Sequence, residues 1–197
     1  MSKSQRTDRR VRYTKKALKN ALVQLMSKRH VSAISVKALC ELADIHRSTF
    51  YAHYRDPEDL LHQIEQEVLD TLKLRLEEMF SVEDDSVKSA FPLSRQALIG
   101  ILEYAKENAN LCKVLLSENC DFAFQKNIME LSNIVELPIS KAYSQHTREY
   151  IGTFGISGSI SFFQKWLHDG MIEPPEEIAD ILLKLVYSGS MSFAQER

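Results

Sequence analysis

The sequence of 197 residues contains few of the residues that interrupt helices, with 6 glycines and 5 prolines. It has 3 cysteines, Cys40, Cys112 and Cys120, and none of them forms a C-x-x-C pair. An odd number of such cysteines argues against a disulfide framework and against a structural zinc site. We therefore expect reduced thiols, with Cys40 in a core, and neither a metal nor another cofactor.

Long apolar runs are also missing, because no stretch approaches the roughly 20 residues that a membrane helix needs. The N-terminal segment MSKSQRTDRRVRY is charged and no hydrophobic region follows it, which argues against a signal peptide or anchor. With 44% apolar and 26% charged residues, the composition is ordinary for a globular protein. We expect a cytoplasmic protein with no membrane partner.

Charge is distributed unevenly, although the formal net charge is only −2. Lys and Arg greatly outnumber Asp and Glu in residues 1–55, whereas acidic residues are in excess over residues 56–197. A basic N-terminal part on an acidic remainder indicates that one end meets a polyanion. The alternative is that the charge excess serves only solubility.

Apolar residues recur at helical spacing almost throughout, which predicts an all-α fold of about nine helices. The first helix runs from about Thr14, a good N-cap, to about residue 28, and a basic arm precedes it. Ser35 caps a short second helix over residues 36–43. A third helix begins near His46 and ends about Tyr54.

The fourth predicted helix has Asp56 as its cap and Pro57 as its first residue, and it runs to about residue 80. A polar stretch over residues 81–92 predicts a linker. Gly170 can supply a left-handed C-cap. The two prolines that follow it end one helix and open the next. Further helices are expected at about 93–107, 109–117, 121–146, 147–169 and 175–189.

Two short helices joined by a tight turn and followed by a longer one predict a helix-turn-helix, whose second helix enters the DNA major groove. That second helix lies in the stretch IHRSTFYAHYRDP, residues 45–57. Phe50 and Tyr54 share a packing face, whereas Arg47, Ser48 and Tyr51 lie largely on another. Guanidinium and hydroxyl groups bind base edges and phosphates, so the free face suits DNA. The basic arm would add phosphate contacts through Arg6, Arg9, Arg10, Arg12 and Lys15.

The stretch TKKALKNALVQLMSKRHVSAISVKALCELADIHRSTFYAHYRDPEDLL, within about residues 9–64, resembles the DNA-binding domain of TetR/AcrR-type transcriptional regulators. The shared features are a hydroxyl-capped helix, an alanine-rich turn and an STFYxHF-like recognition helix before DLL. The segment YIGTFGISGSISFFQKWLHDGMIEPPEEIADILLKLV resembles the C-terminal helices of a subgroup common in Gram-positive bacteria. The resemblance implies a DNA-binding domain over residues 1–58 and a helical effector-binding and dimerisation domain over residues 59–197.

By this resemblance, residues of both motif helices are expected to contact DNA. Arg47, Ser48 and Thr49 would face base edges, and Tyr51 would meet the backbone or a base methyl. Residues at the start of the first motif helix and at the end of the second would meet phosphates. The full expected set comprises Ser35, Val36, Lys37, His46, Arg47, Ser48, Thr49, Tyr51, His53 and Tyr54.

Three positions depart from the family pattern. Asp44 occupies the position of the turn glycine, which is tolerable because Asp enters the left-handed region more readily than most residues. His46 replaces the usual serine N-cap, so a good cap is lost and a titratable ring stands at the groove. Pro57 replaces the usual lysine at the start of the fourth helix, and we expect Arg55 to substitute as a phosphate anchor.

We expect a homodimer, because operators recognised by such folds are pseudo-palindromic. The last two helices are the predicted contact, through a strip of glycines and an apolar stripe. The residues chosen are Gly155, Gly158, Ile178, Ile181, Leu182 and Leu185. Aromatic residues of the middle helices predict an effector pocket, with core packing as the alternative for each. The candidates are Phe122, Tyr143, Phe163 and Trp166.

Together these features predict a sequence-specific regulator of transcription, a dimeric repressor released from its double-stranded DNA operator by a small-molecule effector. A transcriptional activator, or a ligand-independent DNA-binding protein of the same fold, is the alternative. Two other classes stay open, a small helical enzyme with a basic surface and a DNA-packaging or adaptor protein without sequence preference. Nothing in the chain resembles a nucleophile elbow or a catalytic triad, so we expect no enzyme.

Overall fold

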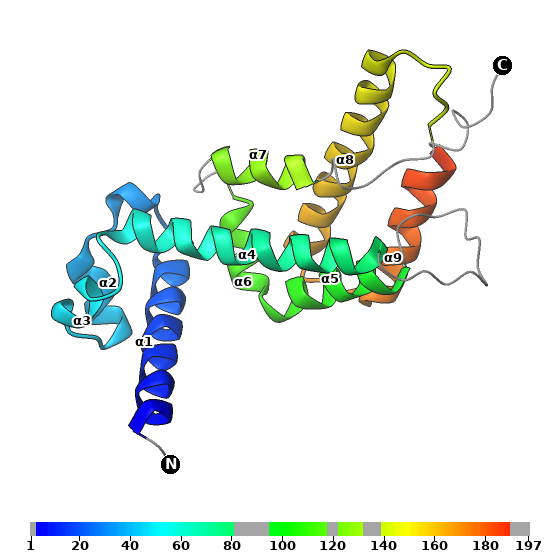
Figure 1. Cartoon of the computed structure of the whole chain (residues 1–197). Helices are drawn as coiled ribbons and strands as arrows, with labels where there is room; N and C mark the ends of the chain where they lie inside the picture. Colours follow the sequence, from blue (N-terminus) through cyan, green and yellow to red (C-terminus); the bar gives the residue numbers. More distant parts are fainter. Residues whose placement is uncertain (1–2, 81–94, 118–121, 132–138, 190–197) are drawn as a thin grey trace. The chain divides into compact units, whose positions relative to one another are not determined.

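The computed structural model describes residues 3–80, 95–117, 122–131 and 139–189. These ranges contain helices and turns and no β-strand (Figure 1). The α-helices are α1 (Lys3–Met26), α2 (Val36–Ala43), α3 (Arg47–Tyr51), α4 (Pro57–Phe80), α5 (Arg95–Glu107), α6 (Ala109–Leu115), α7 (Phe122–Leu131), α8 (Gln145–His168) and α9 (Pro175–Leu183). A 3₁₀ turn, η1 (Val31–Ala33), precedes α2, and a π-helical segment, η3 (Lys184–Ser188), continues α9. The predicted all-α fold is confirmed.

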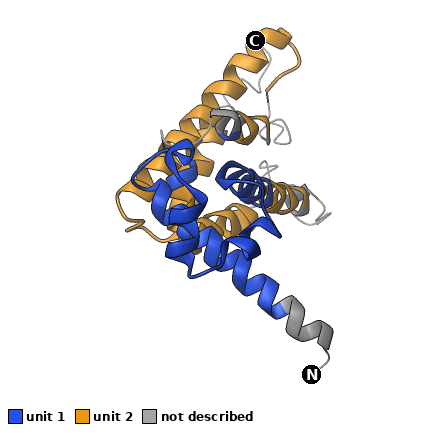
Figure 2. Cartoon of the chain, turned by 90° about the vertical axis from the view of Figure 1, so that its left-hand side faces the viewer, with its two compact units in different colours: residues 1–68, 114–124 blue, residues 69–113, 125–197 orange. Residues whose placement is uncertain are grey.

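The chain forms two compact units (Figure 2). Unit 1 comprises residues 1–68 and 114–124, and unit 2 comprises residues 69–113 and 125–197. Helix α4 contributes its first part to unit 1 and its second part to unit 2, so one continuous helix belongs to both. The boundary predicted after residue 58 separates a DNA-binding domain from an effector-binding domain. These compact units do not test that division of function, so it stays a prediction.

The core of unit 1 brings one face of α1 together with α2 and α3. Leu18 and Leu22 of α1, Leu39 of α2 and Phe50 of α3 are all 0% exposed. Residues four apart lie on one face of a helix, so both leucines of α1 point to the same core. Each such burial contributes about 1.5–3 kcal/mol. This contribution matters because α2 and α3 are too short to persist alone in water.

Helix α1 begins earlier than predicted, at Lys3 instead of about Thr14. Thr14 is 5% exposed and lies inside the helix, so it is not an N-cap. The physical reason is that residues 3–13 contain neither glycine nor proline, and nothing interrupts the helix ahead of Thr14. Basic residues predicted to form an arm, among them Arg9 and Arg12, are therefore part of α1.

Two other predicted boundaries differ from the structure. Helix α3 ends at Tyr51 rather than at about Tyr54. A helix was expected over 121–146, but residues 139–144 are not helical. Ser144 is instead the N-cap of α8, which begins at Gln145. The Oγ of Ser144 accepts a 3.2 Å hydrogen bond from the backbone N–H of Thr147. The predicted linker at 81–92 lies outside the described residues, and Gly170 has the expected left-handed conformation, with φ of +92°.

The core of unit 2 surrounds Trp166 of α8. The indole is 4% exposed, and its N–H donates a 3.1 Å hydrogen bond to the backbone carbonyl of Glu173. Its one polar atom is therefore satisfied inside the core. The buried residues packed with it come from α5 and α9 and are Ile99, Leu102, Ile178, Ala179 and Leu182.

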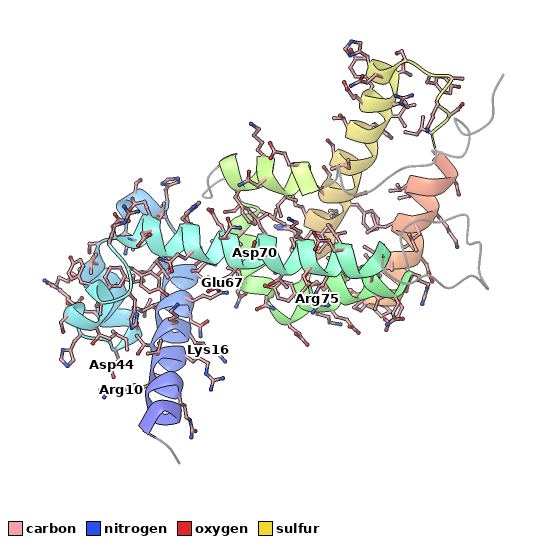
Figure 3. All side chains as sticks on the ribbon, viewed as in Figure 1. Arg10, Lys16, Asp44, Glu67, Asp70 and Arg75 are labelled. Carbon is pink, nitrogen blue, oxygen red and sulfur yellow. The ribbon has the colours of Figure 1, made fainter. Side chains whose placement is uncertain are left out.

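Two arginines join helices of unit 2. The Nη1 of Arg75 in α4 donates to the carbonyl oxygen of Gly100 in α5 at 3.0 Å, and its guanidinium carbon lies 5.6 Å from the centre of the Tyr104 ring (Figure 3). A Cβ at position 100 would lie 2.9 Å from Nη1, so the missing side chain of Gly100 permits this approach. Arg95 of α5 donates two hydrogen bonds, of 2.6 and 3.1 Å, to the carboxylate of Asp180 in α9.

We predict that Phe50→Ala lowers the free energy of unfolding by about 3–5 kcal/mol, because the substitution empties a completely buried position. Tyr51→Ala is the matched control, since this neighbouring ring is 59% exposed and its removal leaves no cavity. Urea unfolding followed by circular dichroism measures both changes. Equal destabilisation by the two variants would show that Phe50 does not anchor α3.

Candidate nucleic-acid interface

The turn between α2 and α3 is set by a cap at one end of α2 and by a left-handed residue at the other. Ser35 is the N-cap of α2, and its Oγ accepts a 3.2 Å hydrogen bond from the N–H of Ala38. Asp44 has φ of 54° and ψ of 46°, and the N–H of Ile45 donates to the carbonyl of Cys40 at 3.0 Å. The predicted cap and the predicted left-handed turn at Asp44 are both confirmed.

Helix α3 has a buried side and an exposed side. Phe50 is completely buried, whereas Arg47 and Ser48 are exposed and Tyr51 is 59% exposed. The rings of Phe50 and Tyr51 meet edge to face with 5.5 Å between their centres. Thr49 is half-buried between the two sides. The predicted division of faces is confirmed, and contact of the exposed face with DNA stays a prediction.

His46 stands at the N-cap of α3 and makes no side-chain cap hydrogen bond. Its backbone carbonyl accepts hydrogen bonds from the N–H groups of Thr49 and Phe50, at 2.9 and 3.1 Å. The backbone alone therefore starts α3, which agrees with the lost cap expected when histidine stands in place of serine. The imidazole of His46 is exposed, whereas His53 is half-buried with its ring centre 6.2 Å from that of Tyr54.

The start of α2 presents one basic side chain to solvent. Val36 is half-buried and Lys37 is exposed. The Nζ of Lys37 lies 3.9 Å from a carboxylate oxygen of Glu41, in a pair whose side chains are both more than half exposed. Such surface pairs contribute little, so Lys37 can exchange this partner for a phosphate.

Tyr54 differs from the rest of the expected set because it is only 5% exposed. Its ring centre lies 5.7 Å from that of Phe50, so both rings belong to the same core. Burial raises the pKa of the Tyr54 hydroxyl, and the carboxylates of Glu67 and Asp59 act in the same direction. Tyr54 is thus a neutral core residue, and its contact with a phosphate stays a prediction.

The junction between α3 and α4 is held by two carboxylates. The Oδ1 of Asp56 accepts a 2.7 Å hydrogen bond from the N–H of Asp59, and the Oδ2 of Asp59 accepts a 2.9 Å bond from the N–H of Arg55. The bond from the Arg55 N–H lowers the pKa of Asp59. Pro57 is the first residue of α4, as predicted, and its ring is buried. The guanidinium of Arg55 lies 3.6 Å from Asp59 and remains largely exposed.

Two of the three cysteines lie in the described part of the chain. Cys40 and Cys112 are buried, which agrees with the expectation for Cys40. Burial raises the pKa of the Cys40 thiol, although Arg47 opposes this shift, so the thiol stays protonated at neutral pH. No group of three His, Cys, Asp or Glu side chains among the described residues could hold a metal ion. None of the described helices is long and apolar enough to cross a membrane.

The predicted dimer residues fall into two groups. Ile178 and Leu182 are 3% and 7% exposed and pack in the core of unit 2. Leu185 is 61% exposed, and Ile181 is half-buried. On α8, Gly155 is half-buried and Gly158 is exposed. An apolar stripe predicts that one side of a helix is covered, but it does not identify what covers it. Here other helices of the same chain cover Ile178 and Leu182.

Two aromatic residues of α8 are exposed and are not among the predicted dimer residues. Tyr150 is 74% exposed and Phe154 is 82% exposed. They lie four residues apart, so they share one face of the helix, and Gly158 continues that face. A Cβ built on Gly158 meets no atom within 4 Å, so the surface there is open. The signal available in the sequence was the four-residue spacing of Tyr150, Phe154 and Gly158.

The candidate effector residues also separate. Trp166 is a core residue with a satisfied N–H, and Phe163 is half-buried with its ring centre 6.1 Å from that of Trp166. Tyr143 is half-buried ahead of α8, where its backbone carbonyl accepts a 3.1 Å hydrogen bond from Arg148. Phe122 begins α7, and its side chain lies outside the described part of the structure. Effector binding by these residues stays a prediction.

Comparison with known proteins places the chain among regulators of transcription. Residues 94–188 match the family model described as a transcriptional regulator C-terminal region. The uncharacterized HTH-type transcriptional regulator YxbF of Bacillus subtilis (strain 168) is 21% identical over 169 residues, which is 86% of this chain. The chain spans 43% of the length of that relative.

Solved structures agree with this assignment. A TetR transcriptional regulator from Streptococcus agalactiae 2603V has 25% identity and a TM-score of 0.61, covering 93% of this chain and 99% of that one. The dihydroxyacetone kinase operon activator DhaS has 20% identity and a TM-score of 0.60, covering 92% and 98%, and shares the fold. The all-α fold, with α2 and α3 joined by a tight turn, defines the class as a helix-turn-helix regulator of transcription. Together these likenesses support a regulator of the TetR family.

We predict that Asp59→Asn weakens the fold at neutral pH and not in acid. The folded pKa of Asp59 is lowered, so its carboxylate stabilises the fold above the unfolded pKa of about 3.9 and this contribution disappears as pH falls through the folded value. Urea unfolding at neutral pH and across the acid range measures the effect. Glu58→Gln, an exposed neighbour in the same turn, is the control. A deficit for Asp59→Asn that is constant at every pH would contradict this linkage.

Proposed function

We propose that the chain is a dimeric transcriptional repressor that binds a pseudo-palindromic operator through α3 and leaves it when a small-molecule effector binds. The observation that carries this proposal is the exposed side of α3, where Arg47, Ser48 and Tyr51 stand on a helix anchored by Phe50. Guanidinium, hydroxyl and phenol groups suit base edges and phosphates in the major groove. No enzymatic activity is proposed.

Base-reading and phosphate-binding roles are proposed for different residues. Arg47, Ser48 and Thr49 meet base edges and give specificity, whereas Lys37 and His53 meet phosphates and give affinity. Lys37 suits this role because it is exposed and held only by a surface ion pair. The remaining proposed contacts are Ser35, Val36, His46, Tyr51 and Tyr54.

The dimer contact is proposed on the exposed face of α8 together with the exposed end of the C-terminal helices. Tyr150, Phe154 and Gly158 supply the α8 side, and Leu185 supplies the other. Large aromatics exposed on one helix face are typical of a surface that another chain covers. Two copies would form a four-helix contact and hold their recognition helices about 34 Å apart, one turn of DNA, or a multiple of it.

Release by an effector is proposed as a population shift. Helix α4 runs without interruption from Pro57, beside α3, to Phe80 in unit 2. An effector bound among the helices of unit 2 would favour a state in which the two recognition helices no longer fit successive grooves. Phe163 and Tyr143 are the candidate contacts that are half-buried rather than buried, and Phe163 packs against the core around Trp166.

An activator of the same fold is the second candidate. DhaS, whose name describes an operon activator, shares the fold, so this architecture serves activation as well as repression. Deletion of the gene separates the two, because loss of a repressor raises expression from the operator and loss of an activator lowers it. A ligand-independent DNA-binding protein would show the same binding with no effect of any small molecule.

A mobility-shift titration tests the proposal. Wild-type protein should prefer the palindrome selected from DNA around its own gene over random DNA by a factor of about 10³ or more at physiological salt. Arg47→Ala should cost about 1–3 kcal/mol and relax the preference at one base pair, whereas Lys37→Ala should weaken binding to every sequence alike. No preference by the wild type would overturn the repressor and favour a packaging protein. Identical behaviour of the two variants on specific and random DNA would overturn the division of roles.

We predict that Phe154→Glu converts the dimer to a monomer, because it places a charge at the centre of the proposed contact. Ile172→Glu is the matched control, since Ile172 is 80% exposed, close to the 82% of Phe154, and lies in the turn between α8 and α9. Light scattering after size exclusion measures the mass of each variant. A dimer that survives Phe154→Glu and dissociates with Ile172→Glu would move the contact away from α8.

A further inference from the structure

Arg75 is a half-buried cation of unit 2 that forms no ion pair with any carboxylate of the described side chains. Its Nη1 donates to the carbonyl oxygen of Gly100, and its guanidinium lies over the ring of Tyr104. Neither partner carries a negative charge. In the same unit the guanidinium of Arg95 is more exposed, and yet it binds both carboxylate oxygens of Asp180. The less exposed of the two guanidinium groups is therefore the one without an anion.

We propose that Arg75 is the anion-binding residue of the effector site and pairs with the carboxylate or phosphate group of a small organic acid. In this pairing the guanidinium exchanges the carbonyl oxygen of Gly100 for the anion and loosens the attachment of α4 to α5. The inference rests on the proposed release from DNA by an effector, and it names the chemical class of that effector.

The guanidinium has the donors that this exchange requires. A guanidinium carries five N–H groups, and the bond to Gly100 uses one of them. The N–H groups point outward in the plane of the guanidinium, so stacking on the Tyr104 ring does not occupy them. A carboxylate or a phosphate accepts two parallel N–H bonds from such a planar edge.

The energetics favour an anion over the present partner. A half-buried guanidinium loses part of its hydration, and burial of a charge is tolerated best when an opposite charge accompanies it. The carbonyl of Gly100 and the ring of Tyr104 compensate only part of this loss. A hydrogen bond between ionised groups is roughly twice as strong as one between neutral groups. A bound acid would therefore displace the Gly100 carbonyl from Arg75.

The surroundings of Arg75 indicate an acid with an apolar body. Leu72 precedes Arg75 by three residues on the same face of α4, and Leu76 follows it. Both leucines are half-buried, as is the ring of Tyr104 on α5. Hydrocarbon that covers such surface removes it from water, whereas a bare inorganic anion does not.

The place of Arg75 on α4 connects the binding of an acid with release from DNA. Helix α4 begins beside α3 in unit 1, and its second part, which carries Arg75, belongs to unit 2 together with α5. Figure 3 shows Arg75 on this second part of α4. A change of partner at Arg75 thus acts directly on the helix that leads to the recognition helix.

The first experiment measures the binding of octanoate and octyl phosphate to the full-length protein by isothermal titration calorimetry, with 1-octanol as the uncharged probe. Wild type should bind at least one acid and should bind it more tightly than octanol, and the preferred acid identifies the anionic group. Arg75→Gln keeps an amide donor and removes the charge, so the affinity for the acid should fall by about 10–100-fold. Lys106→Gln is the matched control, because it removes a positive charge from an exposed residue of α5 and should bind like wild type.

Arg75→Lys separates charge from packing. It keeps the positive charge without the planar fork, so its affinity for the acid should lie between those of wild type and Arg75→Gln. This variant also decides the matter if Arg75→Gln fails to fold, because wild-type affinity in Arg75→Lys would then overturn the inference.

The second experiment follows the fluorescence anisotropy of a labelled operator duplex with and without the acid that binds. The Kd for the operator should rise by about 5–150-fold in wild type and in Lys106→Gln, the range typical of coupling between two sites. It should stay unchanged in Arg75→Gln, which no longer binds the acid.

The outcomes separate the inference from the proposed function. A wild type that binds the acid through Arg75 and shows no operator preference overturns the repressor and retains the anion site. Operator preference in a wild type that binds neither acid overturns the inference alone, and so does acid binding that Arg75→Gln leaves unchanged. Equal affinity for octanol and for the acids also overturns it, because the site would then recognise only the apolar body.

Discussion

The burial of Phe50 is the interaction on which the proposed DNA-binding surface of this molecule depends. A helix of five residues, such as α3, cannot persist in water by its own hydrogen bonds, and its first turn has no side-chain cap. Packing of Phe50 against the core holds the helix in place and at the same time decides which side chains face outward. One buried ring therefore sets both the stability and the presentation of Arg47, Ser48 and Tyr51. The outward display of the proposed DNA contacts is therefore a consequence of core packing.

A similar arrangement is found where α3 meets α4. The carboxylates of Asp56 and Asp59 accept backbone N–H groups on both sides of the junction, and Leu60 and Leu61 of the first turns of α4 are buried, so hydrogen bonds and packing together fix the start of α4. The ion pair of Lys19 with Glu67 then joins α1 to α4 further along. The helix-turn-helix is thus joined to α4 at two places, the α3–α4 junction and the Lys19–Glu67 ion pair. A shift of α4 would therefore favour movement of the motif as one body.

Local signals in the sequence predicted local structure well. The serine that caps α2, the aspartate in the left-handed turn and the proline that opens α4 each act through their own backbone neighbours, so their effects are visible without knowledge of the fold. The predicted start of α1 was wrong for a related reason. Thr14 looked like a cap because of its side chain, but a cap requires that the chain before it leaves the helix, and residues 3–13 do not.

Assignments that depend on partners were harder to make from sequence. The apolar stripe of α9 and η3 contains Ile178, Leu182 and Leu185 at helical spacing, and nothing in that spacing separates a residue covered by α5 from one left in solvent. Tyr54 shows the same difficulty, since a tyrosine just after a recognition helix suits phosphate and core alike. The spacing of the α8 aromatics is visible in the sequence, but the structure was needed to show that their side of the helix is exposed.

Gly100 has a consequence for how relatives of this protein can vary. The guanidinium of Arg75 occupies the space that a side chain at position 100 would take, and it bonds to the carbonyl of that same residue. A larger residue at 100 is therefore compatible with a shorter or differently directed side chain at 75, and an arginine at 75 favours glycine at 100. The two positions, on α4 and α5, are expected to change together in evolution, so an alignment of relatives would record their interaction as a correlated pair.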